Sequence, residues 1–594
     1  MSSGSSTEAE SSYKVYISLP TSGGGGPGGG GNNAWKNPKL YNSSGTLIAS
    51  LTNTVTKTSG NTTATFYYYD FKDADTSVSY YIKGDDYTSR GGWGGSGTTY
   101  TIVSESFSAP TSGTDIYYSI SNSYTTSGST RTYALSNVTN TYSGTSDASE
   151  DNGTGYNAIG LKADSIITVG GGTIDISNSG SMSKSIKANQ HVYINGGNLT
   201  LKPSGAMQVI NNDASYSSGI KCDDLEINGG TVEMTVSGSS GRGISADNVT
   251  TNGGELTITN SGAGVSGTND TYTAKCIKAD DSVKLNAGKI SLTATGTGGK
   301  GIKSSGTYTQ GTSDGEGPTL TVTTSGNSLG GGGGGGWGGG QQSSGGSSSK
   351  GIKVMGTAVV YGGETEVSTS TNGAEGFESK TSVDIRGGKH YFKCYDDCIN
   401  SAGSISFNGG VTVCWSTGND AVDSNYGRSG AICIGNGAAF AYTTKGAPEE
   451  GFDCDNNSYI QITGNGIGLS AGAAQGGGGM GGGSSSTISN AKQGYYFCTN
   501  TISYSANTYY TLADASGNNL VTYSLPSSLS SSLALFTATG MVKGSKYYLW
   551  SSSSAPTDAT TAWHGMYLGS SAKGSTEVKV FKDGSTSVNY FTAQ

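Results

Sequence analysis

The middle of this 594-residue chain consists of a sequence unit that repeats mostly every 22 to 34 residues. We align the units on one apolar residue, called position zero. These residues are Leu161, Ile186, Ile220, Ile244, Ile277, Ile302, Ile352, Phe377, Ile399, Val422 and Phe452. In most units the second glycine of a Gly-Gly or similar pair falls 10 or 11 residues after position zero, before a short apolar-alternating stretch. One arc of each unit therefore has a fixed length and the other varies, which is typical of stacked repeats.

This register predicts an all-β fold. The central part is expected to be a parallel β-helix of about 11 coils, in which each coil is hydrogen-bonded to the next about 4.8 Å away. On both sides, alternating apolar and polar residues between Ser- and Gly-rich turns predict antiparallel β domains. The expected organisation is a flexible leader (1–12), an N-terminal β domain (13–140), the β-helix (141–475) with a Gly-rich insert (328–349), a Gly-rich linker (476–486) and a C-terminal β domain (487–594).

Position minus one of every unit is occupied by a small residue. Glycine stands there in most units, for example Gly301 and Gly351, and serine, cysteine or alanine in the others. This pattern predicts a tight corner with little room for a side chain. Positions minus two and plus one are then expected to flank the corner and to point outward.

These two flanking columns change sign at the same place. Position minus two is mainly basic up to Lys350 and acidic from Glu375 onward, and position plus one changes from Lys353 to Glu378. A column of carboxylates on neighbouring coils is costly in like-charge repulsion unless cations lie in it. We therefore expect the acidic stretch to bind Ca²⁺, either to let the coils close or to bridge the protein to an acidic sugar. The candidate ligands are Glu375, Glu378, Asp396, Asp397, Asp420, Asp423, Glu450, Asp453 and Asp455.

The basic half and nearby aromatic residues are the candidate carbohydrate contacts. They are Lys275, Lys278, Lys300, Lys303, Lys350, Lys353, Tyr395, Trp415 and Tyr426. An alternative interpretation makes the lysine column structural, because acidic residues such as Asp280 stand two positions after several of the plus-one lysines. Exposed ion pairs of that kind add only about 0–1 kcal/mol each. The aromatic residues are also open to a second interpretation, in which they pack between coils.

Composition narrows the class of protein. The net charge of -9 and the lack of a basic cluster argue against nucleic acid as a partner. No apolar run is long enough for a transmembrane helix. The start MSSGSSTEAESS is interpreted as the leader of an exported protein, with a lipid anchor or other surface attachment as one use of it. Eight cysteines leave disulfides and buried thiols both open, and three scattered histidines argue against zinc.

Several segments carry a resemblance to a known family. GIKCDDLEINGGTVEM, EGFESKTSVDIRGGKHYF, DDCINSAGSISFNGG and GNDAVDS resemble the bacterial carbohydrate-binding domain-containing β-helix proteins, over about residues 150–480. The resemblance implies a right-handed, pectate-lyase-like parallel β-helix and bound calcium on the stretch 375–455. It also implies binding of polygalacturonate and cellulose at the cell surface, without established catalysis. The Gly-rich insert, the cysteines and the large N-terminal β segment depart from the family pattern.

The expected function is therefore calcium-dependent, non-catalytic binding of plant cell-wall polysaccharide (polygalacturonate or pectin, and cellulose) at the bacterial cell surface. One alternative is a polysaccharide lyase on the same fold, which would need a base of depressed pKa such as a lysine near the acidic coils. The other is a structural adhesin or surface-fibre subunit. No catalytic residue is assigned from the sequence.

Overall fold

The computed structural model describes residues 13–591 except 20–34, 36, 60–61, 72–76, 89–96, 110–115, 138–158, 211–212, 268–269, 331–345, 474–487, 489, 499–500, 543–544 and 582–587. The described part is all-β apart from one short 3-10 helix, Asn457–Tyr459. The chain forms two compact units, Met1–Asn157 and Ala158–Gln594. The predicted leader, most of the Gly-rich insert and the predicted linker lie outside the described residues.

The first unit contains one sheet of mixed direction rather than the antiparallel sheet predicted. Its strands are β1 (Tyr13–Ser18), β2 (Lys39–Asn42), β3 (Leu47–Ser50), β4 (Thr54–Ser59), β5 (Thr62–Phe71), β6 (Ser79–Lys83), β7 (Tyr87–Thr88), β8 (Thr99–Ser104), β9 (Phe107–Ser108), β10 (Ile116–Ser127) and β11 (Thr130–Asn137). Most pairs are antiparallel, but β1 pairs with β10 and β8 with β11 in parallel. Both parallel pairs join strands separated by a long stretch of chain, which local alternation of residues does not reveal.

The second unit begins with a stack of rungs, and each complete rung contributes three strand positions. First positions are β12 (Ile159–Ala163), β15 (Lys184–Ala188), β20 (Ser218–Lys221), β27 (Lys300–Ser304), β30 (Lys350–Val354), β33 (Glu375–Ser379), β35 (Ile399–Ser401), β37 (Val422–Ser424) and β40 (Phe452–Asp453). Second positions are β13 (Ile166–Val169), β16 (His191–Ile194), β21 (Asp224–Ile227), β28 (Thr307–Gln310), β31 (Thr357–Val360), β38 (Ile432–Ile434) and β41 (Ile460–Ile462).

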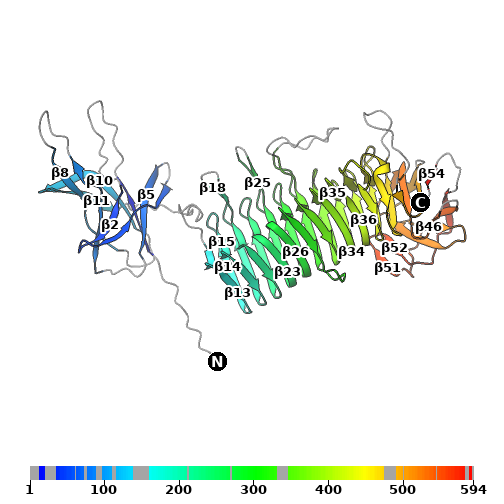
Figure 1. Cartoon of the computed structure of the whole chain (residues 1–594), viewed down its shortest axis with the longest axis horizontal. Coiled ribbons are helices and arrows are strands. Elements are labelled where there is room, and N and C mark those ends of the chain that lie inside the picture. Colours follow the sequence, from blue (N-terminus) through cyan, green and yellow to red (C-terminus); the bar gives the residue numbers. More distant parts are fainter. Residues whose placement is uncertain are drawn as a thin grey trace, which may run out of the picture. The chain divides into compact units, whose positions relative to one another are not determined.

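Third positions are β14 (Thr173–Asn178), β17 (Asn198–Pro203), β22 (Thr231–Val236), β29 (Thr319–Thr324), β32 (Glu364–Thr369), β39 (Ala438–Thr443) and β42 (Ile467–Gly472). Some strands run through two or three positions without a break, namely β23 (Arg242–Asn260), β26 (Lys275–Ala294), β34 (Ser382–Cys394) and β36 (Ile405–Ser416). Short hairpins β18–β19 (Gln208–Ile210, Asp213–Ser215) and β24–β25 (Val265–Ser266, Thr271–Tyr272) leave the stack in the variable arcs. Figure 1 shows the rungs following one another.

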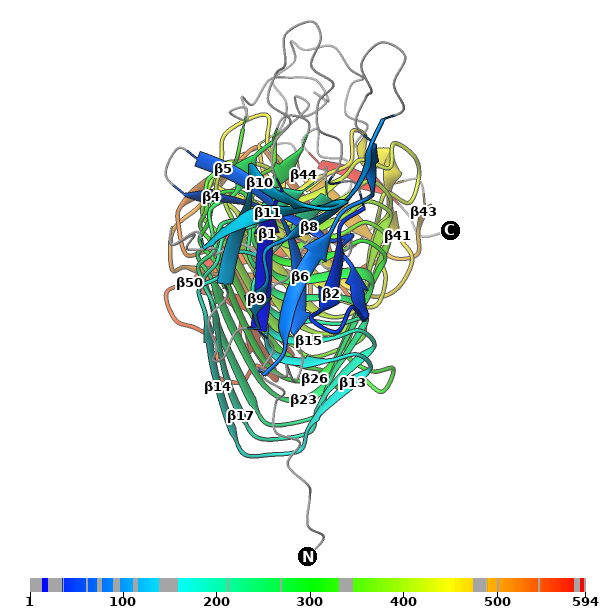
Figure 2. The same cartoon turned by 90° about the vertical axis from the view of Figure 1, so that its left-hand side faces the viewer.

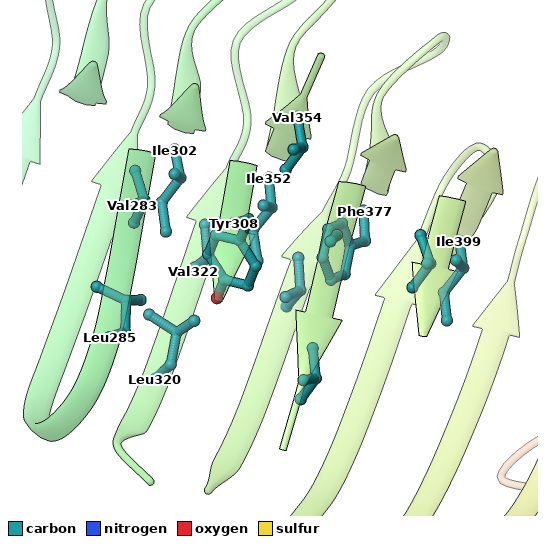
Figure 3. Close-up of a cluster of buried hydrophobic side chains, with 14 of the residues drawn as sticks. Val283, Leu285, Ile302, Tyr308, Leu320, Val322, Ile352, Val354, Phe377 and Ile399 are labelled. Atoms are coloured by element: carbon teal, nitrogen blue, oxygen red, sulfur yellow. The ribbon is translucent and has the colours of Figure 1, made fainter. Parts of the chain in front are cut away.

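The repeat defined by position zero appears as a parallel register. Each position-zero residue lies opposite the next, from Leu161 opposite Ile186 to Val422 opposite Phe452. Figure 2, which looks along the stack, shows β14 and β17 on one side and β13 on another. The apolar side chains between these sides form a continuous core, in which Ile302, Ile352 and Phe377 follow one another (Figure 3).

The recurring second glycine has a conformational role. It has a positive φ in each of the eight units in which it falls 10 or 11 residues after position zero, for example +93° at Gly197 and +89° at Gly388. Residues with a Cβ rarely adopt this conformation, so the turn between the second and third positions selects glycine. This explains why that arc keeps a fixed length.

The C-terminal strands belong to the same compact unit as the stack. They are β43 (Asn490–Ala491), β44 (Tyr495–Cys498), β45 (Ile502–Tyr504), β46 (Tyr509–Asp514), β47 (Asn519–Ser524), β48 (Leu529–Ser531), β49 (Leu533–Thr537), β50 (Tyr547–Ser552), β51 (Thr561–Trp563), β52 (Met566–Leu568), β53 (Thr576–Phe581) and β54 (Val588–Phe591). Strand β49 pairs antiparallel with β42 of the last rung. A second core joins Val413 and Phe440 of the last rungs to Tyr523 and Leu549. The segment therefore covers one face of those rungs.

Candidate functional site

The corner before position zero is as tight as the sequence predicts. A Cβ added to Gly301 would lie 2.3 Å from Cγ1 of Val322 and 2.6 Å from the carbonyl oxygen of Gly351. At Gly351 it would lie 2.5 Å from Cγ1 of Val367. Position minus one therefore faces the packed interior and leaves no room for a larger side chain.

The two charged columns on either side of this corner are in register. Lys300 lies opposite Lys350, and Lys350 opposite Glu375. The same strand pair sets Lys353 opposite Glu378. We call the minus-two and plus-one side chains from Lys275 to Asp453 the charge seam. Its sign changes between two adjacent strands, β30 and β33.

The charge seam is largely buried, although both of its columns were expected to point outward. Lys300 and Lys350 are each 5% exposed, and Asp397 is 3% exposed. The variable arcs explain the difference, because they lie over the seam. The amine of Lys300 donates to the carbonyl oxygens of Gly298 (2.9 Å) and Ser348 (3.2 Å), which belong to two of these arcs.

The basic half is defined as Lys275, Lys278, Lys300 and Lys303, and backbone carbonyl oxygens accept hydrogen bonds from the amines of the first three. The amine of Lys275 donates to the carbonyl oxygen two residues earlier, that of Thr273 (2.6 Å), just as Lys300 does. Burial, reinforced by neighbouring cations, lowers the pKa of Lys275 and brings that of Lys300 to about 7. Lys278 contacts Asp280, as the structural interpretation expects. The buried amines of Lys275, Lys278 and Lys300 therefore offer a glycan no open contact, whereas Lys303 is partly exposed.

The junction of the two halves is a buried ion-pair cluster. The amine of Lys350 lies 2.5 Å from Glu375, and that of Lys353 lies 2.9 Å from Glu378. Lys380 also pairs with Glu378. Burial alone would raise the pKa of Glu378, but Lys350 and Lys353 outweigh it and bring the pKa to about 2. Glu375 and Glu378, both candidate calcium ligands, therefore have lysine partners.

The acidic half is defined as Asp397, Asp420, Asp423, Glu450 and Asp453, and it differs from the junction in its partners. Among the residues that the structure describes, none of the five forms an ion pair with lysine, arginine or histidine. Burial, followed by the charge of Asp453, raises the pKa of both Asp423 and Glu450 to about 8. Burial raises the pKa of Asp397 and Asp420 as well.

Amide groups partly satisfy these carboxylates. The side chain of Asn400 donates to Asp397 (2.9 Å) and to Asp423 (2.8 Å), and that of Asn419 donates to Asp397 (2.8 Å). The backbone N–H of Glu450 donates to Asp420. Asn400 and Asn419 were not predicted as site residues. Asn400 stands in the plus-one column, so the repeat alignment could have identified it as a site residue. Asn419 lies in a variable arc, where no aligned position points to it.

The acidic half fits a hard cation by the chemistry of its donors. Its groups are oxygen donors, they have no cationic partner among the described residues, and they come from neighbouring rungs, which suits the oxygen coordination of calcium. They are not gathered into a finished centre, because no group of three or more His, Cys, Asp or Glu in the described residues is arranged to hold a metal ion. The other two candidate ligands lie at its margin, Asp396 partly buried and Asp455 exposed.

The three candidate aromatic residues do not form one platform. Tyr395 is 37% exposed and directly precedes Asp396 in the chain. The ring of Trp415 is stacked with Tyr442 at 6.0 Å between centroids, and the amine of Lys393 lies 4.5 Å from its centroid. Tyr426 packs against the core, with Arg428 over its ring. Only Tyr395 thus combines exposure with a place beside the acidic half.

The cysteines take no part in a disulfide. All eight are free thiols, and all but the partly exposed Cys433 are buried. Burial raises the pKa of Cys222 and Cys276 to about 12, which keeps these thiols protonated and unreactive.

Comparison with known proteins gives one match. Residues 198–421 match the family model described as carbohydrate-binding domain-containing protein. The matched stretch contains the basic half, the junction and the beginning of the acidic half of the charge seam. No curated protein and no solved structure matches the chain. Within the described residues, no helix has the length and apolar character needed to span a membrane.

Proposed function

We propose that this chain, whose residues 198–421 belong to a carbohydrate-binding domain family, binds polysaccharide with the help of calcium held in the acidic half of the charge seam. The proposed calcium binding is supported by the set of buried carboxylates that have no cationic partner among the described residues. Beyond the amide hydrogen bonds, such a set is stabilised when the groups take up protons or share a cation. The raised pKa values of Asp423 and Glu450 show that these groups tend to take up protons when no cation is bound. Calcium would be the shared cation.

Asp397, Asp420, Asp423, Glu450 and Asp453 would hold the ion, with Asp396 and Asp455 at the margin. Glu375 and Glu378 are left out of this set because lysines neutralise them. Bound calcium supplies positive charge that carboxylates of an acidic sugar can share. The exposed ring of Tyr395 offers an apolar surface next to that charge, on which a sugar ring can stack.

The proposed ligand is therefore an acidic polysaccharide of the polygalacturonate or pectin type, with cellulose as a further candidate that rests on the family resemblance alone. The same resemblance supports an extracellular, cell-surface location with attachment through the leader. We further propose that the rungs are coils of a right-handed parallel β-helix. Parallel crossovers are right-handed in almost all proteins, which supports this handedness.

The lyase alternative gains no support from the site. Lys300 has the depressed pKa that a base needs, but its amine is enclosed by Gly298 and Ser348. A base must reach the proton that it abstracts. The adhesin alternative likewise has no observation in its favour.

Calorimetric titration with oligogalacturonate, in calcium and again in chelator, tests the proposal. We expect binding in calcium, little binding in chelator, and at least a tenfold weaker affinity in a variant with Asp423→Asn and Glu450→Gln. Glu233→Gln, which removes an exposed carboxylate on β22, is the matched control. Polyglutamate separates sugar recognition from general attraction to polyanions. Equal affinity with and without calcium would exclude the calcium bridge, and the absence of binding to any polysaccharide would overturn the function.

A further inference from the structure

An arginine of the first unit lies among three tyrosine rings. Cζ of Arg131, on β11, is 3.9 Å from the centroid of the Tyr100 ring and 4.5 Å from that of the Tyr124 ring. The ring centroid of Tyr87 follows at 5.5 Å. These rings come from β8, β10 and β7, which the pairs β11–β8, β11–β10 and β7–β8 bring together (β8, β10 and β11 are labelled in Figure 1). The sheet thus places one guanidinium against several aromatic rings, whose faces attract a cation.

The charge of this arginine has no counter-charge in the described part of the chain. Among the residues that the structure describes, Arg131 forms neither an ion pair nor a hydrogen bond. Of its guanidinium nitrogens only Nε is a buried atom without a partner. The residue as a whole is partly exposed. Its terminal N–H groups therefore face solvent, where an anion can reach them.

The three tyrosines form an open rim around this group. Tyr124 is 42% exposed, and Tyr87 and Tyr100 are partly exposed. None of their phenol hydroxyls makes a hydrogen bond to another described residue. A hydroxyl can donate to one sugar hydroxyl and accept from another, and the accessible ring of Tyr124 offers an apolar surface. A ligand can therefore contact the guanidinium and the rim at the same time.

The charges of the cluster favour a ligand with one carboxylate. The parallel N–H groups of a guanidinium match the two oxygens of a carboxylate. Carboxylates of the chain border the cluster: Asp86 directly precedes Tyr87, and Glu105 accepts a hydrogen bond (2.9 Å) from the backbone N–H of Leu135, four residues after Arg131. They repel further negative charges that come within the screening length of about 8–10 Å. A polyanion is therefore disfavoured.

We propose that Arg131, with Tyr87, Tyr100 and Tyr124 as its rim, is a binding site for a single uronic-acid group attached to an otherwise neutral sugar chain. The uronate carboxylate accepts hydrogen bonds from the terminal N–H groups of Arg131, and neighbouring sugar hydroxyls pair with the phenol hydroxyls. The site needs no calcium and shares no residue with the charge seam. Its ligand also differs, because a polygalacturonate chain carries a carboxylate on every sugar. The first unit would thus recognise a second kind of polysaccharide.

Calorimetry on the full chain in chelator tests this site. The probe is aldotetraouronic acid, a xylotriose that carries one glucuronic-acid group, and xylotetraose is its uncharged counterpart. We expect the acidic probe to bind and xylotetraose to bind at least about tenfold more weakly, because hydrogen bonds to charged groups are the stronger ones. Arg131→Gln should weaken binding of the acidic probe about tenfold or more, and Tyr124→Ala about threefold to tenfold.

Arg386→Gln is the matched control. Arg386 also lies over a tyrosine ring, that of Tyr361 at 5.1 Å, but it is paired with Asp384 at 2.7 Å. Arg131→Lys is a second test, because it keeps the charge and loses the parallel N–H groups, so that affinity should fall between those of the parent and Arg131→Gln. Melting temperatures of the variants close to that of the parent exclude unfolding as the cause.

The variant with Asp423→Asn and Glu450→Gln should bind the acidic probe as the parent chain does, so this site and the calcium-dependent site can fail separately. An acetylated and amidated tetrapeptide with one glutamate should bind at least about tenfold more weakly than aldotetraouronic acid, because it lacks the sugar hydroxyls. Equal affinity for peptide and sugar would overturn the sugar specificity. Absence of binding of the acidic probe, or full affinity in Arg131→Gln, would overturn the site.

Discussion

The imidazole ring of His564 lies flat against the phenol ring of Tyr391, with centroids 3.7 Å apart and planes inclined by 2°. Nε2 of the same imidazole lies 3.0 Å from a carboxylate oxygen of Glu366. His564 sits in the turn between β51 and β52, whereas Tyr391 and Glu366 belong to third-position strands of the stack. This contact fixes the C-terminal hairpin to the outer face of the rungs.

Replacing His564 by asparagine should loosen that hairpin. Asparagine tolerates the positive φ of this position (38°), so the change removes the ring stacking without adding backbone strain. We expect a loss of about 1–2 kcal/mol in the free energy of unfolding. Hydrogen exchange of residues 561–568 should increase as well. Unchanged protection of these amides would show that other contacts hold the hairpin.

Calcium should stabilise the folded chain if the acidic half binds it. At a concentration one hundred times the dissociation constant, the gain is about 2.7 kcal/mol for one ion. Thermal unfolding in calcium and in chelator measures this gain. A variant with Asp397→Asn and Asp420→Asn should lose it, whereas Glu233→Gln should keep it. An equal calcium effect in both variants would mean that the ion binds outside the charge seam.

The buried lysine at position 300 predicts a pH dependence of stability. Its pKa is about 7 in the folded chain and 10.5 without burial. Between these values the unfolded chain holds a proton that the folded chain has released, so stability rises with pH. Relative to Lys300→Met, the parent should gain stability from pH 7 to 9.5, by at most about 1.4 kcal/mol per pH unit. Parallel curves for the two proteins would contradict the lowered pKa.

The corner glycines should not tolerate a methyl group. Gly301→Ala places a Cβ 2.3 Å from Val322, so the core must shift, at about 1–3 kcal/mol of stability. Gly170→Ala is the matched control, since a Cβ there has nothing within 4 Å. Urea unfolding of both variants measures the difference. Equal midpoints would mean that the corner can relax at little cost.

The features of the structure that were predicted correctly from the sequence are those that recur in every repeat unit. The register of Ile302 on Ile352, the small corner at Gly301 and the change of sign from Lys350 to Glu375 all follow from aligned positions, and each is found in the structure. Burial of the charge seam was missed because it depends on the variable arcs, whose lengths and residues do not align. The partners of Lys300 at Gly298 and Ser348 belong to such arcs.

The lysine partners of Glu375 and Glu378 were within reach of the sequence. Stacking the columns already sets Lys350 beside Glu375 and Lys353 beside Glu378, so ion pairs were the expected result of the register itself. The docking of the C-terminal segment could not be predicted from the sequence, because no local pattern links His564 to Tyr391. The parallel pairs of the N-terminal sheet were missed for the same reason: they join distant strands.

The cover that the C-terminal segment places on the last rungs has a consequence during biosynthesis. Val413 and Phe440 are buried in the core that they share with Tyr523 and Leu549. Translation delivers the rungs first, and nascent chains fold from the N-terminal side. Until the strands up to β50 have emerged from the ribosome, the apolar side chains of the last rungs remain exposed to solvent and can associate with other proteins. A chain halted after Gly472 should therefore be a strong client for chaperones.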